Sequence, residues 1–80
     1  YQTLVDKGLQ LWNGGNKTQA QEYFLASLKI RSDNPEAMFY AGRLYQDAGD
    51  TENANALFDK VVGEHGDTEY AERARNARGY

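Results

Sequence analysis

Residues 35–58, PEAMFYAGRLYQDAGDTENANALF, decide the fold, because they repeat the spacing found in the 34 residues before them. A shift of 34 positions superimposes five identical pairs: Gly8 on Gly42, Gly15 on Gly49, Ala20 on Ala54, Phe24 on Phe58 and Asp33 on Asp67. Apolar character is also kept, with Leu4 on Met38 and Leu11 on Tyr45. Self-similarity at a fixed period of this length is typical of stacked repeats. We therefore expect two consecutive units of one design.

Turn residues divide the chain into five predicted helices. Glycine at Gly14-Gly15, Gly49 and Gly66 ends a helix at little conformational cost. Helices restart at Asn16 with Gln19 as a capping box, at Asp33-Asn34-Pro35, at Asp50 or Thr51, and at Asp67 or Thr68. Apolar residues between these signals recur every three to four positions. Short loops make neighbouring helices antiparallel, so the prediction is an all-α fold with helices at about 2–13, 17–31, 35–48, 52–64 and 69–78.

Composition narrows the class of protein. The formal net charge of −3, with charges mixed along the chain, argues against DNA or another nucleic acid as partner. No apolar run approaches the roughly 20 residues of a membrane-spanning helix. The absence of cysteine excludes disulfides and thiolate zinc sites, and is compatible with the cytoplasm or a bacterial periplasm. Because the first residue is Tyr1, we expect a fragment or a processed product.

The repeated positions resemble those of tetratricopeptide repeats (TPRs). In that family, small residues lie where paired helices cross, which here are Gly8 with Ala20 and Gly42 with Ala54, and a large residue such as Phe24 or Phe58 fills the gap. Pro35 resembles the proline that joins consecutive repeats. The last helix departs from the pattern, because Asn76 replaces the recurring glycine, and it resembles a terminal capping helix.

The resemblance implies a single domain, residues 1–80, folded as a right-handed solenoid of antiparallel helix-turn-helix units. Repeat one spans 1–34, repeat two spans 35–68, and the capping helix spans 69–80. It also implies a protein-interaction scaffold that binds a peptide or partner helix in a concave groove. Some members clamp a chaperone's terminal carboxylate with lysines and asparagines. Val5, Leu9 and Tyr40 occupy three of those places here, which argues for an apolar or amphipathic segment instead.

The first helix of each unit lines the groove in this family, and Gln2 and Glu36 map to its beginning. The predicted partner-binding residues are Val5, Leu9, Trp12 and Asn13 in repeat one, and Phe39, Arg43, Gln46 and Asp47 in repeat two. Leu4, Gly8 and Leu11 are assigned to the core, so the first helix carries more apolar surface than one packing partner needs. For Val5 and Leu9 a second interpretation stays open, namely burial between adjacent first helices. Arg43 can pair with a partner carboxylate or with Asp47 four residues on.

The sequence has few residues in patterns typical of catalytic, metal-binding or phosphate-binding sites. The one histidine, His65, has no companion histidine or cysteine, and the acidic residues Asp47, Asp50 and Glu52 lack the spacing of a calcium loop. Gly14-Gly15-Asn16-Lys17 lacks the strand and the Gly-Lys-Ser/Thr order of a phosphate loop. We therefore expect no enzyme activity, no metal and no cofactor. The alternative to peptide binding is a structural, self-assembling element in which the first helix docks on a second copy, giving a homo-oligomer.

Overall fold

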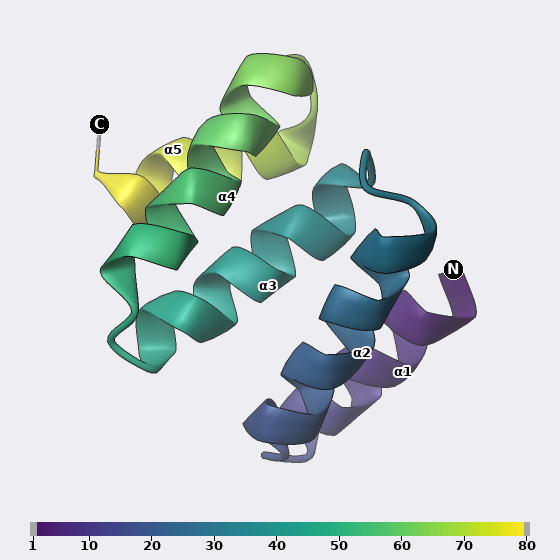
Figure 1. Ribbon diagram of the computed structural model, residues 1–80. Coiled ribbons are helices and arrows are strands. Elements are labelled where there is room, and N and C mark those ends of the chain that lie inside the picture. Colours follow the sequence, from purple (N-terminus) through teal and green to yellow (C-terminus); the bar gives the residue numbers. More distant parts are fainter. Residues whose placement is uncertain (1, 80) are drawn as a thin grey trace.

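A computed structural model describes residues 2–79, which form helices and turns only. The helices are α1 (Gln2–Asn13), α2 (Lys17–Ile30), α3 (Pro35–Asp47), α4 (Thr51–Glu64) and α5 (Glu69–Arg78). The pairs α1/α2 and α3/α4 are antiparallel hairpins, and α5 packs on both α3 and α4 (Figure 1). No helix within residues 2–79 has the length and apolar character needed to cross a membrane. The predicted all-α fold is confirmed, with helix boundaries shifted by one residue at most.

The two hairpin turns are built alike. Gly15 and Gly49 take left-handed φ values of 86° and 84°, as predicted for residues that end a helix. After each glycine, the next backbone N–H reaches back to α1 or α3, from Asn16 to the carbonyl of Leu11 (2.8 Å) and from Asp50 to that of Tyr45 (2.9 Å). Each turn therefore satisfies helix-end carbonyls that would otherwise lack donors.

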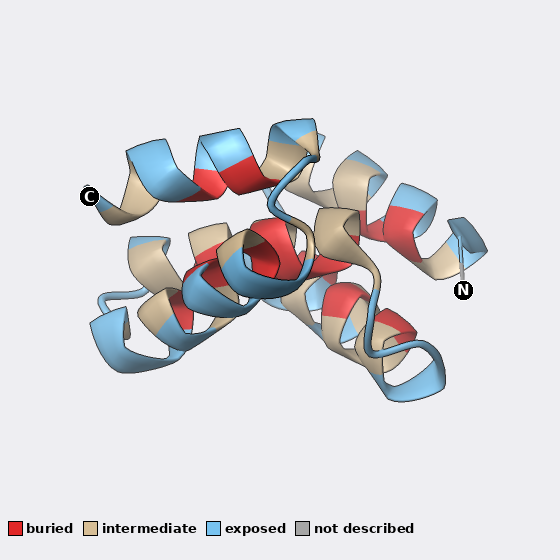
Figure 2. Cartoon of the chain, turned by 90° about the horizontal axis from the view of Figure 1, so that it is seen from above, coloured by how far each residue is buried: buried red, intermediate tan, exposed pale blue. Residues whose placement is uncertain are grey.

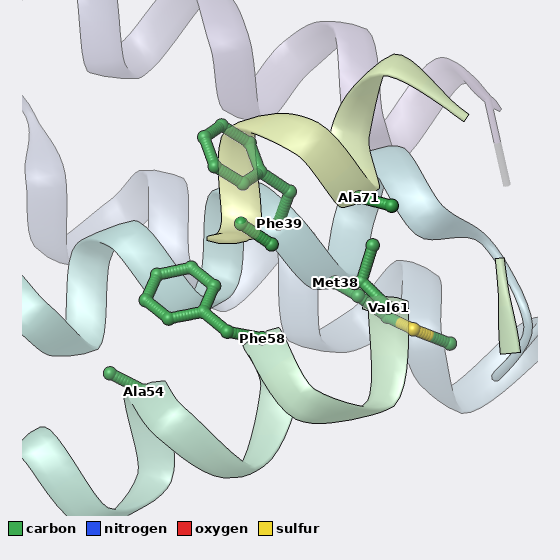
Figure 3. Close-up of a cluster of buried hydrophobic side chains, with 7 residues drawn as sticks. Met38, Phe39, Ala54, Phe58, Val61 and Ala71 are labelled. Carbon is green, nitrogen blue, oxygen red and sulfur yellow. The ribbon is translucent and has the colours of Figure 1, made fainter. Parts of the chain in front are cut away.

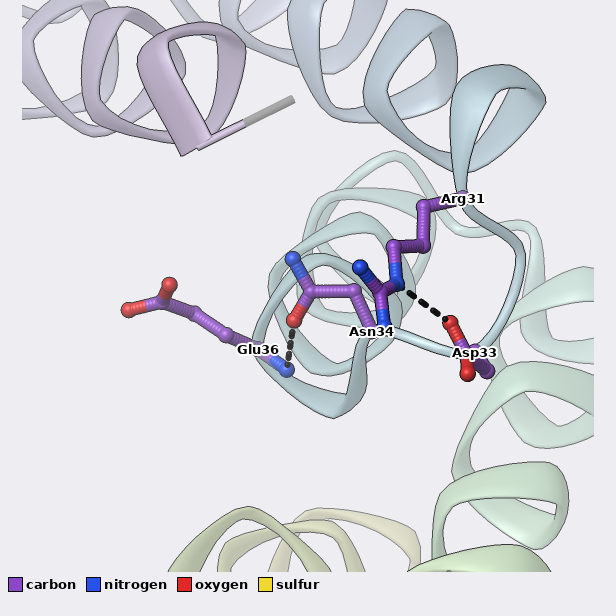
Figure 4. A network of polar contacts seen from close by, with 4 residues as sticks. All are labelled: Arg31, Asp33, Asn34 and Glu36. Carbon is purple, nitrogen blue, oxygen red and sulfur yellow. Dashed lines mark hydrogen bonds and ion pairs between the residues drawn. The ribbon is translucent and has the colours of Figure 1, made fainter.

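Side-chain caps fix the starts of three helices. Asn34 Oδ1 accepts from the N–H of Glu36 (3.1 Å), beside the Arg31–Asp33 pair of the same loop (Figure 4). Asp50 caps α4 and Thr68 caps α5. The predicted cap by Asn16 is wrong, because its side chain makes no such bond.

Each hairpin crosses where a glycine meets a phenylalanine ring. A methyl group added at Gly8 would lie 2.8 Å from Cε1 of Phe24, and one added at Gly42 would lie 2.7 Å from Cε1 of Phe58. Both rings are fully buried. The repeat of small and large residues in the sequence thus marks two equivalent close approaches of helix backbones.

The core runs through the molecule as two adjoining clusters, with buried residues on the inner sides of the helices (Figure 2). The cluster between α3, α4 and α5 contains Met38, Phe39, Ala54, Phe58, Val61, Ala71 and Ala74 (Figure 3). The other, between α1, α2 and α3, contains Val5, Ala20, Phe24, Ala37, Ala41 and Leu44. Leu28 of α2 packs against both clusters, so the two hairpins share a continuous interior.

The structure reverses two assignments on α1. Val5 is fully buried in the same cluster as Ala37 and Ala41 of α3, whereas Leu4 and Leu11 are only half-buried. The predicted core face Leu4–Gly8–Leu11 is therefore confirmed for Gly8, holds in part for Leu11, which packs against the same cluster, and is wrong for Leu4. The reason is the position of α3, which closes over the Val5 side of α1 and leaves the Leu4 side open.

Candidate functional site

Three half-buried aromatic side chains connect α1, α3 and α5 on the side formed by the first helices. The rings of Trp12 and Tyr40 meet edge to face with centroids 5.4 Å apart, and those of Tyr40 and Tyr70 meet in the same way at 6.0 Å. Rings in these geometries attract one another beyond the area they bury. Leu9 is half-buried one turn before Trp12 and packs against the same interior. We call Leu9, Trp12, Tyr40 and Tyr70 the aromatic row.

The carboxylate of Glu36 connects the beginnings of α1, α3 and α5 through two hydrogen bonds. Glu36 Oε1 accepts from Nε2 of Gln2 at 3.2 Å, and its Oε2 accepts from the phenol of Tyr70 at 3.0 Å. Both partners are 34 residues from Glu36, so the three occupy equivalent positions in α1, α3 and α5. Burial, together with the hydrogen bond and negative charge of Glu36, raises the pKa of Tyr70 far above its ordinary value. Tyr70 is therefore a neutral donor at physiological pH.

Cations flank the row. Arg43 is half-buried and donates from Nη1 to Oε1 of Gln46 at 3.3 Å, and Gln46 in turn donates from Nε2 to the carbonyl of Ala77 at 2.8 Å. Arg73 lies over the ring of Tyr70 at 5.4 Å from its centroid. Arg73 also pairs with the carboxylate of Glu69 at 3.6 Å. A guanidinium carries five N–H donors, so Arg43, which gives one to Gln46, can still donate to a carboxylate or a backbone carbonyl. The row thus combines apolar faces with charged donors.

The predicted site residues fall into three groups. Leu9 and Trp12 are half-buried members of the row, Arg43 is half-buried on α3 three residues after Tyr40, and Asn13 is exposed at the end of α1. Val5 cannot contact a partner because it is 0% exposed, and Phe39 is 8% exposed and packed on Phe58 and Tyr70. We therefore correct Phe39 from groove to core. Val5 is also corrected from groove to core, which confirms for this residue the second interpretation, burial between adjacent first helices.

Two further assignments change in detail. Gln46 is held by its bond to the carbonyl of Ala77, so it anchors α5 to α3. Asp47 pairs with Lys17 of α2 at 3.5 Å and does not pair with Arg43, whose partner is Gln46. Asp47 also lines a pocket at the seam of α2 and α3 with Gln21, Leu44 and Tyr45. The structure thus places Asp47 in a seam between the two hairpins.

Tyr40 and Tyr70 are not among the predicted partner-binding residues. The 34-residue period contains a signal for Tyr70, which follows Glu36 by one period and Gln2 by two. Interpreting the last helix as a cap without groove positions passes over that signal. Tyr40 maps to a groove place of the carboxylate clamp, and it is half-buried there, whereas the neighbouring Phe39 is covered by Phe58 and Tyr70.

A second pocket lies between α1 and α2. It is lined by Leu4, Lys7, Leu11, Gln19, Glu22, Tyr23 and Ala26. None of these residues belongs to the aromatic row. The molecule therefore offers two separate surfaces with apolar character.

Comparison with protein families agrees with the geometry. Residues 1–34 and residues 36–68 each match a family model described as tetratricopeptide repeat. The chain matches no curated protein and no solved structure in the same kind of comparison. The two matched segments correspond to the two hairpins, each with its glycine–phenylalanine crossing.

Proposed function

The chain belongs to the tetratricopeptide repeat family, whose repeats generally mediate protein–protein interaction, and from that premise we propose that it binds a peptide or partner helix along the aromatic row. The observation that carries the proposal is the continuous contact of Trp12, Tyr40 and Tyr70 across three helices. Partly exposed tryptophan and tyrosine are favoured anchors in protein interfaces. They lose little conformational entropy when a partner covers them, because they are already packed on one side.

The chemistry of the row describes the segment that fits it. Leu9 and the rings offer an apolar strip, which suits aliphatic or aromatic side chains on one face of the partner. Arg43, which donates to the neutral amide of Gln46, offers further donors beside that strip, and these suit a carboxylate on the same partner. Arg73 already pairs with Glu69 at 3.6 Å, so Arg43 is the cation on which this preference rests. We therefore propose an amphipathic partner segment that carries at least one acidic residue next to its apolar face.

Trp12 is the only tryptophan, so its fluorescence reports directly on the proposed site. A random peptide library displayed on phage is selected on the immobilised chain, and the enriched peptides are synthesised. We expect them to be amphipathic and acidic, and to change the emission of Trp12 on binding.

Two variants test the location. Leu9→Glu and Arg43→Glu should each weaken binding of the selected peptides by about tenfold or more, since every 1.4 kcal/mol is a factor of ten. The matched control is Lys60→Glu, a charge reversal at an exposed position of α4. Peptides that bind equally well to all three variants, without any change in Trp12 emission, would overturn the proposal.

A further inference from the structure

The open face of the α1/α2 hairpin is a second apolar surface. It is formed by the half-buried Leu4, Leu11, Tyr23 and Ala26, which line one pocket. Ile30 extends the surface, because it follows Ala26 by four residues and Tyr23 by seven on the same side of α2. Ile30 is 68% exposed and is the one large hydrophobic side chain recorded as exposed within residues 2–79. We call Leu4, Leu11, Tyr23, Ala26 and Ile30 the open face.

In the second hairpin, part of the corresponding face is covered. Met38, the counterpart of Leu4, is fully buried, and Tyr45 and Leu57, the counterparts of Leu11 and Tyr23, pack against the core. Lys60 and Glu64, the counterparts of Ala26 and Ile30, are exposed. The element packed against α3 there is a helix, α2, which contributes Leu28 to the interior. Within residues 2–79, no helix covers the open face in this way. The repeat therefore indicates that the natural cover for such a face is another helix.

The charges on the open face differ from those of the covered one. Lys7 is exposed where the second hairpin has the fully buried Ala41, and Glu22 lines the same pocket as Lys7. A helix packed as α2 packs on α3 would bury the ammonium group of Lys7, which is costly unless a carboxylate pairs with it. The cover must therefore bring an acidic group to Lys7, and a basic group beside Glu22, which is exposed, would pair the second charge of the pocket.

A second copy of this chain meets both requirements. In a two-fold interface each contact occurs twice, so Lys7 of one copy can face Glu22 of the other and the reverse. The apolar residues of the two open faces would then cover one another. We propose that the chain forms a symmetric dimer through the open face, with two reciprocal Lys7–Glu22 ion pairs. This surface is separate from the aromatic row, so the dimer does not depend on the peptide-binding proposal.

Reversing the charges tests the pairing. Sedimentation equilibrium over a wide range of concentrations should show a monomer–dimer equilibrium for the unmodified chain. Lys7→Glu alone and Glu22→Lys alone each place like charges opposite one another, and each should weaken dimerisation by about tenfold or more. The double variant restores opposite charges and should dimerise again. An equimolar mixture of the two single variants should form a heterodimer.

Controls separate dimerisation from folding. Lys60→Glu changes an exposed charge on α4 and should leave the dimer unchanged. Ile30→Glu should weaken the dimer while circular dichroism shows the helical content unchanged. A chain that stays monomeric at all concentrations would overturn the proposal. It would equally be overturned by single charge reversals that dimerise as well as the unmodified chain, or by a double variant that fails to recover.

Discussion

The phenol of Tyr70 donates a 3.0 Å hydrogen bond to Oε2 of Glu36, exactly one repeat period earlier in the chain. The other oxygen of the same carboxylate accepts from Gln2, one period earlier still. One side chain thus connects α1, α3 and α5 at equivalent positions. The 34-residue spacing of contacts therefore extends beyond the two hairpins to α5. The same bond holds Tyr70 where its ring contacts Tyr40.

Glu36→Ala should lower the free energy of unfolding by about 1–2 kcal/mol, because it removes the charged acceptor of two hydrogen bonds that are partly exposed to solvent. Urea unfolding followed by circular dichroism measures the change. Glu52→Ala is the matched control, since Glu52 also lies in the first turn of a helix and is exposed. If both variants lost the same unfolding free energy, the effect of Glu36 would come only from its interaction with the helix dipole and not from its hydrogen bonds.

High pH should destabilise the chain through Tyr70. Its pKa is raised in the folded state above the ordinary value of 10.0, chiefly by burial and then by the bond to Glu36. The unfolded chain therefore loses this proton first as the pH rises past about 10, which favours unfolding. Stability measured by urea titration should fall over that range, and it should fall less in Tyr70→Phe. A parallel fall in both proteins would exclude Tyr70 as the cause.

Gly42→Ala should destabilise the chain by about 1–3 kcal/mol, because the added methyl group would lie 2.7 Å from Phe58. Gly63→Ala is the control, as Gly63 is also in a helix and a methyl group there meets nothing within 4 Å. That variant should be more stable by about 0.5–1 kcal/mol, because alanine favours the helix. Thermal unfolding monitored at 222 nm separates the two. A stabilising effect of Gly42→Ala would contradict the close crossing.

The sequence predicts the packing of each hairpin better than the packing between hairpins. The Gly8–Phe24 crossing follows from a local pattern, because residues on consecutive antiparallel helices must meet. Which side of α1 is buried depends on where α3 lies, and spacing alone does not determine that. The spacing therefore assigns Leu4 to the core and Val5 to the groove, whereas the structure buries Val5 and leaves Leu4 half-buried, although each hairpin is predicted correctly.

The same limit applies to the candidate site. Repeat positions predict Leu9, Trp12 and Arg43 as site residues; Leu9 and Trp12 belong to the aromatic row, and Arg43 is half-buried near Tyr40 on α3. Phe39 was misplaced, because the docking of α5 covers it, and the bond of Gln46 to Ala77 depends on that same docking. The angle at which a capping helix docks is set by side-chain packing far apart in the sequence.

Phe39→Ala should therefore act on stability and not directly on binding. Removing a ring that is 8% exposed leaves a cavity next to Phe58 and should cost about 3–5 kcal/mol. Leu9→Ala removes a half-buried side chain and should cost less, while weakening peptide binding. Urea unfolding measures the loss of unfolding free energy in each variant. A smaller loss for Phe39→Ala than for Leu9→Ala would contradict the assignment of Phe39 to the core.

A ¹H–¹⁵N NMR titration of the labelled chain with a library-selected peptide tests whether partners bind along the aromatic row. We expect the largest shift changes, including that of the indole N–H of Trp12, at Leu9, Trp12, Tyr40 and Tyr70, while the signals of Lys60 and Glu52 stay unchanged. Shift changes confined to the α1/α2 pocket or to α4, with the indole signal of Trp12 unmoved, would contradict it.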